Sequence, residues 1–250
     1  MITALDLISI NVNDPSTAAA LTEKLLGRKV EKSSVQLGNL ALQLRPKAGN
    51  EGLKGLTFAV DNIDAAFKTA ERRALKPQPP GQGNTVALDT EATFGVPISL
   101  VEGVPTTPSL QLADSPVTGL DHVVIRTTHP NRAVALYGAR LGLDLRLDRT
   151  EPKWSTRFMF FRCGDLIIEV VHNLKEPASD APDHLWGLTW RVANADTAHV
   201  RLKASGFDVS EIRTGRKPGT RVFTVRNNTL GVPTLLLQPS VREESTGVFA

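Results

Sequence analysis

The chain has 250 residues, a length that suits one large folded domain or two small ones. Hydrophobic residues make up 41% and charged residues 22%, a balance typical of a folded protein. The formal net charge is +3, and the basic residues are spread along the chain. This distribution excludes the dense basic face of a nucleic-acid-binding protein, although it favours attraction of a small anionic molecule.

Cys163 is the only cysteine, which excludes an intramolecular disulfide and favours a reducing, cytoplasmic setting. The N-terminal residues lack the pattern of a secretory signal, and no apolar run approaches the roughly 18 residues of a membrane span. We therefore expect a cytoplasmic protein, monomeric or homodimeric, that binds a small molecule and neither nucleic acid nor membrane.

The first half of the chain predicts two units in which a strand precedes a helix. Alternating, β-branched residues at 4–12 predict a strand, and Asp14-Pro15 supplies a cap and first turn for a helix that ends at Gly27. Short strands follow, one of them at 40–44. A second strand at 56–60 leads into a helix over 65–73, capped by Asp61 or Asn62, and strand-rich sequence continues to Val101.

The second half predicts the same succession of elements. The expected elements are a strand at 120–126, a helix at 131–141 ending at Gly142, strands near 157–162 and 165–172, a strand at 187–192, a helix at 195–204 ending at Gly206, and strands near 220–226 and 233–237. We expect an N-terminal domain at 1–103, a proline-containing linker at 104–117, a C-terminal domain at 118–240 and a polar tail at 241–250.

The two halves also repeat one another in sequence. The corresponding segments are 4–10 with 119–125, 38–44 with 164–170, 55–60 with 187–192, and 95–97 with 231–233. Their order is kept, and the offset grows from 115 residues for the first pair to 136 for the last, as small loop insertions would make it. This pattern indicates a duplication.

The repeated segments resemble a known family. The strand Gly119-Leu-Asp-His-Val-Val-Ile125, followed by a helix that ends at Leu141-Gly142, resembles the opening of a glyoxalase/bleomycin-resistance/extradiol-dioxygenase module. The helix at 195–206 resembles that of the partner module, and the segment at 231–237 resembles its closing strand. The resemblance implies an α+β fold of the vicinal oxygen chelate superfamily, in which four βαβββ modules form two cup-shaped sheet domains.

The resemblance also implies where metal ligands belong, on the first strand and on a late strand of each module. In the third module these positions hold His122 and Glu169, both typical ligands, and in the fourth they hold Thr189 and Leu235, which are not. In the first half the four positions hold non-ligand or weak residues: Leu7, Gln43, Thr57 and Ser99. The N-terminal half is therefore predicted to be a non-catalytic copy.

Two alternatives follow for the C-terminal cup. His122 and Glu169 could hold a divalent metal (Zn, Mn, Ni or Fe) with a third ligand from His172, His184 or Gln238, although His172 should face away from Glu169. Without a metal, Glu169 could act as a base with His122 as its partner. Ring-cleaving dioxygenase activity is disfavoured, because that pattern needs ligands where the fourth module has none.

Further residues are candidates for substrate binding. They are Arg126, which shares a strand face with His122, Thr189 and the aromatic Trp190 on the next module's first strand, and the basic-loop residues Arg216 and Arg221. The leading functional hypothesis is a glyoxalase-like lyase or isomerase acting on a small oxygenated, anionic substrate. The alternative is a metal-free protein that binds or sequesters an antibiotic or aromatic ligand.

Overall fold

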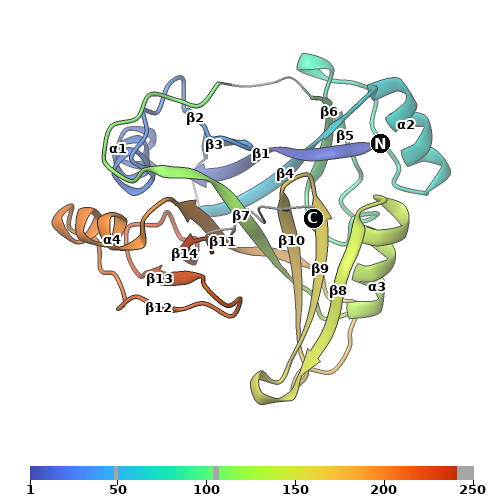
Figure 1. Cartoon of the computed structure of the whole chain (residues 1–250). Helices are drawn as coiled ribbons and strands as arrows, with labels where there is room; N and C mark the ends of the chain where they lie inside the picture. Colours follow the sequence, from blue (N-terminus) through green and yellow to red (C-terminus); the bar gives the residue numbers. More distant parts are fainter. Residues whose placement is uncertain (48–49, 104–106, 241–250) are drawn as a thin grey trace, which may run out of the picture.

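The computed structural model describes residues 1–47, 50–103 and 107–240 and contains two mixed β-sheets, each accompanied by helices (Figure 1). The α+β class and the two cup-forming halves predicted from the sequence are confirmed. The N-terminal half contains β1 (Ile2–Val12), α1 (Pro15–Leu26), β2 (Ser34–Gln36), β3 (Ala41–Pro46), β4 (Gly52–Val60), α2 (Ile63–Arg72), the 3-10 turn η1 (Gln82–Asn84), β5 (Val86–Ala87) and β6 (Ile98–Glu102).

The C-terminal half begins with the strand that follows the expected linker. Its elements are β7 (Val117–Arg126), α3 (Pro130–Val134), the π-helical segment η2 (Ala135–Arg140), β8 (Asp144–Glu151), the 3-10 turn η3 (Pro152–Trp154), β9 (Thr156–Cys163), β10 (Leu166–Asn173), β11 (His184–Val192), α4 (Ala195–Ala204), β12 (Arg213–Thr214), β13 (Arg221–Val225) and β14 (Thr234–Gln238).

Each sheet joins two modules through their first strands. The N-terminal order is β2-β3-β1-β4-β6-β5, and the C-terminal order is β12-β13-β14-β11-β7-β10-β9-β8. In both sheets the two central strands, β1 with β4 and β7 with β11, run antiparallel, and each pairs on its other side with the last strand of its own module in parallel. The N-terminal modules are shorter, because one strand of each is reduced to isolated bridges.

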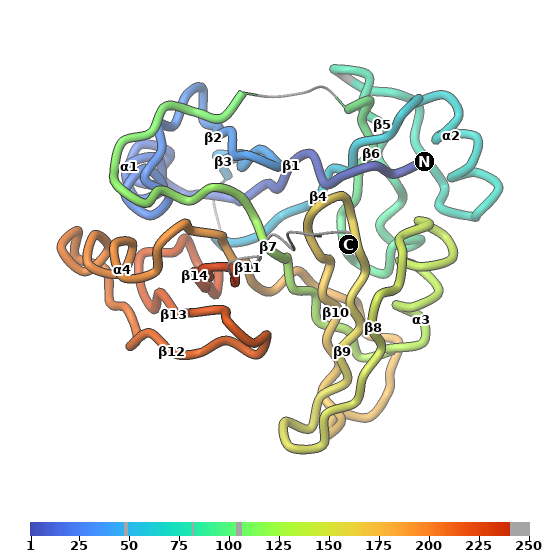
Figure 2. Tube along the Cα trace, in the orientation of Figure 1, coloured from blue at the N-terminus to red at the C-terminus, as the bar shows by residue number. Residues whose placement is uncertain are grey.

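The helices of the two halves meet in pairs (Figures 1 and 2). Helix α4 lies beside α1, where Arg201 donates to the backbone oxygens of Lys24 and Leu25, and η2 lies beside α2, where Arg140 Nε donates to the Arg73 oxygen at 2.9 Å. One hydrophobic core cluster runs through both halves. The first helix therefore pairs with the fourth and the second with the third, as an approximate two-fold relation between the halves requires.

Several predicted boundaries are confirmed by cap geometry. Asp14 accepts from the backbone N–H groups of Ser16 and Thr17 at the start of α1, and Gly27 ends this helix in the left-handed region, at φ +65°. Asn62 caps α2 by accepting from the Ala65 N–H at 2.9 Å.

The helix predicted at 131–141 differs from the expectation. It begins as α3 and continues as π-helix, in which the Leu141 N–H donates to the Leu136 oxygen at 2.8 Å. Strand β8 had no counterpart in the prediction, because Leu145 and Leu147 alternate with polar residues only in its first half and the rest of the strand is polar. Seven of its eight residues are exposed.

A repeated glycine holds the same close contact in both halves. A Cβ added to Gly55 would lie 3.1 Å from the Pro97 oxygen, and one added to Gly187 would lie 2.9 Å from the Pro233 oxygen. The amides that follow these glycines, of Leu56 and Leu188, donate to those same oxygens. The glycines recur because the first strand of each closing module approaches the backbone before its last strand too closely for a side chain.

Candidate functional site

The site begins with an irregularity in β7. His122 pairs with Thr189 on β11, but the next β11 residue, Trp190, pairs with Leu120, so Asp121 is an extra residue in β7. Such a β-bulge breaks the strict alternation of side chains. Asp121 and His122 are consecutive, yet their side chains contact each other, with 2.8 Å between Asp121 Oδ1 and His122 Nδ1.

The other ring nitrogen of His122 faces a carboxylate from the neighbouring strand. His122 Nε2 lies 3.2 Å from Glu169 Oε2, and Glu169 belongs to β10, which runs parallel to β7. Only 7% of Glu169 is exposed, whereas the His122 side chain is 21% exposed. The structure thus brings together the two residues that the sequence singled out.

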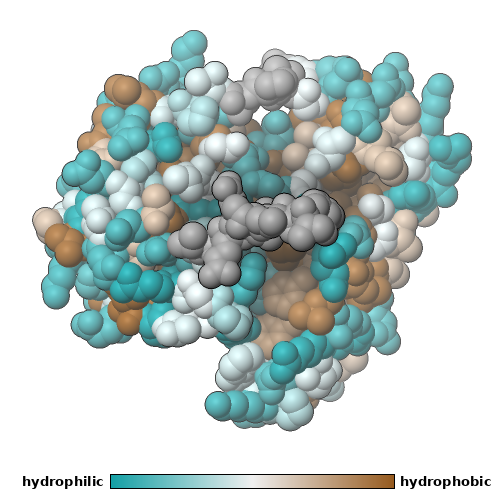
Figure 3. Space-filling view, viewed as in Figure 1, coloured by the Kyte–Doolittle hydropathy of each residue, from teal (hydrophilic) through white to brown (hydrophobic). Residues whose placement is uncertain are grey.

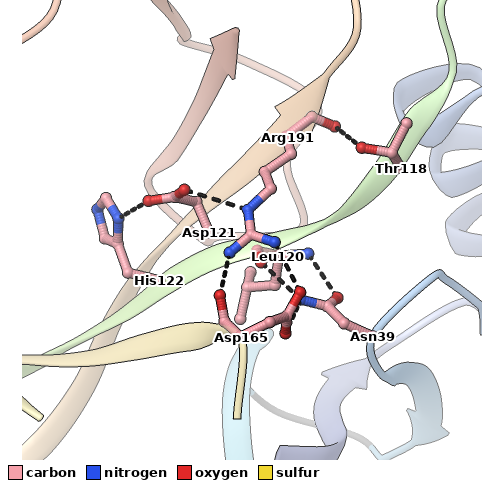
Figure 4. Close-up of polar contacts among 7 residues, drawn as sticks. All are labelled: Asn39, Thr118, Leu120, Asp121, His122, Asp165 and Arg191. Carbon is pink, nitrogen blue, oxygen red and sulfur yellow. Dashed lines mark hydrogen bonds and ion pairs between the residues drawn. The ribbon is translucent and has the colours of Figure 1, made fainter. Parts of the chain in front are cut away.

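Asp121 also connects this pair to a polar chain that crosses between the halves (Figure 4). Arg191 on β11 donates to Asp121 through Nε at 3.2 Å and to Asp165 through Nη1 at 2.8 Å. Asp165 in turn accepts from the side-chain amide of Asn39 at 3.0 Å, and Asn39 also bonds both backbone polar groups of Leu120. The orientation of His122 is therefore supported by residues of both halves.

Burial and neighbouring charges move the two carboxyl pKa values in opposite directions. Burial raises the pKa of Glu169 above its ordinary value, although the charges of His122 and Arg216 oppose this rise. Burial would also raise the pKa of Asp121, but its hydrogen bonds and charge interactions with His122 and Arg191 lower that pKa overall. Glu169 is the carboxyl group better suited to accept a proton near neutral pH.

Aromatic side chains and one arginine occupy the mouth beside this pair. Arg216, from the loop between β12 and β13, lies over Trp154 and Phe158, with its Cζ 4.1 Å and 4.7 Å from their ring centroids. Phe160 stacks on Phe158, with 6.1 Å between their ring centroids, and Phe160 on β9 pairs with Glu169 on β10. Figure 3 shows hydrophobic side chains gathered in a recess at this side of the molecule.

The remaining predicted binding residues are divided between the cup and other places. Thr189 is buried and lies opposite His122 in the strand register, and Arg126 is exposed at the end of β7, with its Cζ 4.3 Å from the Trp186 ring. Trp190 is only 2% exposed and belongs to the hydrophobic core, because alternation along β11 turns it away from Thr189. Arg221 binds Asp196 on α4. Trp190 and Arg221 are therefore removed from the set that could contact a ligand in this cup.

A divalent metal in this cup would need further donors beside His122 and Glu169. The described residues contain no group of three or more His, Cys, Asp or Glu side chains that could hold an ion. The three suggested third ligands lie elsewhere: His172 is buried with Nδ1 3.1 Å from the Thr127 oxygen, Gln238 accepts from the Ala195 N–H at 2.8 Å, and His184 is exposed in a cavity of about 430 Å³ that Arg126 also lines. His122 and Glu169 alone are fewer ligands than a catalytic metal site uses.

Sequence reasoning missed Asp121, Arg191 and Asp165. For Asp121 and Asp165 the only signal was the repeat itself, because Asp6 occupies the position of Asp121 in the first half and Asn39 occupies that of Asp165. Arg191 had no such signal, because its counterpart is Ala59. Cys163, for which no nucleophilic role was predicted, is buried, and burial raises the pKa of its thiol to about 12. Among the described residues, no helix is long and apolar enough to cross a membrane.

Comparisons with known proteins agree on the fold. Residues 119–229 match the model of the Glyoxalase/Bleomycin resistance protein/Dioxygenase superfamily. No curated protein gives a significant sequence match.

Solved structures of similar fold cover nearly the whole chain. A triple variant of 4-hydroxymandelate synthase from Streptomyces coelicolor is 13% identical, with 95% of this chain and 93% of that chain covered and a TM-score of 0.72. A catechol 2,3-dioxygenase is 16% identical, with 96% and 88% covered and a TM-score of 0.72. The Mn(II)-bound glyoxalase from Novosphingobium aromaticivorans is 17% identical, with 95% and 82% covered and a TM-score of 0.71. At these identities the likeness establishes the fold alone.

Proposed function

We propose that this chain, which has the vicinal oxygen chelate fold and whose residues 119–229 match the model of the Glyoxalase/Bleomycin resistance protein/Dioxygenase superfamily, is an enzyme of lyase or isomerase type. Its substrate is a small oxygenated anion bound in the C-terminal cup. The observation that carries the proposal is the buried Glu169 carboxylate, which lies 3.2 Å from His122 and whose pKa is raised.

Glu169 is the proton acceptor in this proposal. Its burial disfavours the charged form, so neutralising the carboxylate offsets part of the cost of taking a proton from a carbon next to a carbonyl or carboxylate group. Return of that proton to a neighbouring carbon gives isomerisation, whereas loss of a leaving group from the adjacent carbon gives elimination. His122 can donate a hydrogen bond from Nε2 to the substrate oxygen on which negative charge develops only in its imidazolium form, because its Nδ1 proton is held by Asp121.

Asp121 and Arg216 prepare the cup for this chemistry. Asp121 fixes the orientation of the His122 ring through Nδ1 at 2.8 Å, in the way a carboxylate commonly orients a catalytic imidazole. Arg216 lies over Trp154 and Phe158 at the mouth, where its guanidinium can pair with the substrate's anionic group. The aromatic rings beside it exclude water from the reacting atoms.

No step is assigned to a metal, because the described donor set does not fit one. Thr189 is a weak ligand and Leu235 offers none, so the site has too few donors to hold an ion strongly. Elemental analysis of protein purified without chelators, beside H122A/E169A, tests this point. Near-stoichiometric metal that disappears in the variant would replace the metal-free route with a chelate route at the same pair.

The experiment that tests the enzyme proposal measures deuterium incorporation from D₂O. A set of small 2-oxo and 2-hydroxy acids is incubated with the wild type, with Glu169→Gln and with Gln43→Asn, the matched control at the equivalent position of the other cup. For the acid that exchanges, we expect Glu169→Gln to lower the rate by about 100-fold or more, because it removes the base without changing the side-chain volume. The control should exchange at the wild-type rate.

Ligand sequestration is the second candidate, and the aromatic wall of Trp154, Phe158 and Phe160 favours it. A sequestration protein would bind an aromatic or antibiotic anion in the C-terminal cup and release it unchanged. Full exchange activity in Glu169→Gln would falsify the role of this residue as base. Tight binding of an aromatic anion with no exchange in any variant would establish sequestration instead.

A further inference from the structure

The N-terminal half contains a polar cavity of its own, of about 470 Å³, on the face of its sheet that corresponds to the C-terminal cup. Its floor is formed by two rows of neighbouring residues, Ser9 with Gln43 and Leu7 with Thr57 and Ser99. A cavity of this volume is within the range of small-molecule binding sites. The absence of a histidine at Leu7 removes the catalytic pair from this cup, but it leaves the cavity.

Two cations lie at one end of this cavity. Arg45 lines it from the end of β3, and Lys54 lines it from a bulge in β4, where Ser9 pairs with Gly55 and Ile10 pairs with Leu53. Within residues 1–47, 50–103 and 107–240, neither side chain has a carboxylate partner within 4.0 Å. Two cations without a carboxylate partner on one cavity wall are suited to a carboxylate ligand.

A carboxyl group lies toward the other end. Asp6 is the extra residue of a bulge in β1, because Leu5 pairs with Phe58 and Leu7 pairs with Thr57. It is the counterpart of Asp121, but leucine replaces the histidine partner, and Ala59 occupies the position of Arg191. Burial alone raises the pKa of Asp6. The carboxyl oxygens of Asp6 line this end of the cavity, where they can accept a hydrogen bond from a ligand hydroxyl group.

The floor between these ends offers neutral polar groups. The side chains of Gln43, Thr57 and Ser99 make no hydrogen bond to another described residue, and the Ser9 hydroxyl has only a long contact of 3.5 Å to the Gly55 oxygen. From Asp6 to the bulge at Lys54 the sheet extends roughly 12 Å, at about 3.3 Å per residue. The cavity is therefore charged at both ends, polar between them, and several carbon atoms long.

We propose that the N-terminal cup is a second, metal-free binding site for a polyhydroxylated carboxylate of sugar-acid size. Arg45 and Lys54 bind its carboxylate, the floor residues Ser9, Gln43, Thr57 and Ser99 bind its hydroxyl groups, and Asp6 accepts from a hydroxyl at the far end. The site is independent of the reaction proposed for the C-terminal cup, whose wall is aromatic and whose counterparts of Arg45 and Lys54 are Val171 and Trp186.

The test uses D-gluconate as the probe, followed by amide chemical-shift mapping of the full chain. Hexanoate has the same carboxylate and chain length without hydroxyl groups, and sorbitol has the hydroxyl groups without the charge. We expect saturable shifts for gluconate at residues of β1, β3 and β4, with hexanoate and sorbitol each binding at least about tenfold more weakly. A site that reads hydroxyl groups must reject an acid that lacks them.

Variants locate the site and separate it from the proposed reaction. Arg45→Gln and Lys54→Gln should each weaken gluconate binding by about tenfold, because each removes a charge-assisted hydrogen bond while keeping a polar side chain. Arg216→Gln, the control at the other cup, should bind gluconate at the N-terminal cup as the wild type does. Turnover in the C-terminal cup should be unchanged in the Arg45 and Lys54 variants.

Three outcomes would overturn this proposal. They are no saturable shift with gluconate, equal binding of gluconate and hexanoate, and shifts that map to β7 and β10 in place of β1 and β3. None of them tests whether Glu169 acts as a base, so a failure here is distinguishable from a failure of the proposed reaction. Well-dispersed spectra of Arg45→Gln and Lys54→Gln verify that any loss of binding does not come from unfolding.

Discussion

The two cups share a backbone and differ in a few side chains. Both have a bulge at the same point of their first strand, and both bulges contain an aspartate, Asp6 or Asp121. In the C-terminal cup this aspartate orients His122, whereas in the N-terminal cup the following residue is Leu7. The bulge therefore belongs to the duplicated fold, while the chemistry depends on the residue that follows it.

Among variants that leave Glu169 in place, the largest expected effect comes from removing the charge at the bulge. Asp121→Asn should lower turnover by about 10- to 100-fold, because the His122 ring loses the carboxylate that orients it. The charge of Asp121 also raises the pKa of Glu169, so the acid limb of the pH–rate profile should move to lower pH. The matched variant Asp6→Asn should leave both the rate and the profile unchanged. Equal losses in the two variants would mean that the bulge acts on folding alone.

The second prediction concerns the contact between the halves. Asn39→Ala removes hydrogen bonds to Leu120 and Asp165 and should lower the free energy of unfolding by about 1–3 kcal/mol. Urea denaturation measures this loss, with the exposed Asn13→Ala as control, for which a change within about 0.5 kcal/mol is expected. A wild-type midpoint for Asn39→Ala would show that this polar chain does not hold the halves together.

The next effect distinguishes Arg216, in the loop between β12 and β13, from Arg221, at the start of β13. Arg216→Gln should raise the KM of an anionic substrate by about tenfold with little change in kcat, because Arg216 binds substrate and reacting state alike. Arg221→Gln should leave KM unchanged, because its partner is Asp196 on α4. Steady-state kinetics of the two variants measure KM and kcat. A raised KM in Arg221→Gln with an unchanged KM in Arg216→Gln would instead place the anion site on the face of the sheet that α4 covers.

The smallest expected effect is a pH-dependent change in the free energy of unfolding when Glu169 is replaced. The pKa of Glu169 is raised in the folded chain, so its carboxylate destabilises the native state as pH rises above the ordinary value of 4.5 and does so fully above the folded pKa. Glu169→Gln should therefore unfold at a higher urea concentration than the wild type near neutral pH, and this difference should disappear in acid. A variant less stable than the wild type at neutral pH would mean that the ion pair with His122 outweighs burial.

The contact between His122 and Glu169 was predictable, because a histidine and an acid stand inside apolar strands at the positions that the family resemblance marks for ligands. Asp121 and Arg191 were missed, because strict alternation turns Asp121 away from His122 and no pattern in a single sequence marks the bulge that reverses this. The core position of Trp190, which we expected to bind substrate, could have been predicted, because the same alternation puts its side chain on the face opposite Thr189.

Helices and strands were likewise predictable where a local pattern of residues marks them. Asp14 and Gly27 marked the ends of α1 correctly because their side-chain and backbone preferences act locally. The π-helical turn at Ala135–Arg140 was not visible, because its one-residue insertion depends on packing and leaves no local signal. The expected linker is described only in part, since residues 104–106 lie outside the described residues, as does the tail at 241–250.

The bulge at Asp6 also bears on how this chain can change by mutation. A leucine codon of the form CTT or CTC becomes a histidine codon by one base substitution, and any glutamine codon becomes a glutamate codon in the same way. At Leu7 and Gln43 those substitutions would place an imidazole and a carboxylate where the other half has His122 and Glu169, beside an aspartate already in position. A duplicated half that keeps its bulge thus remains only a short mutational path from a second acid–base centre.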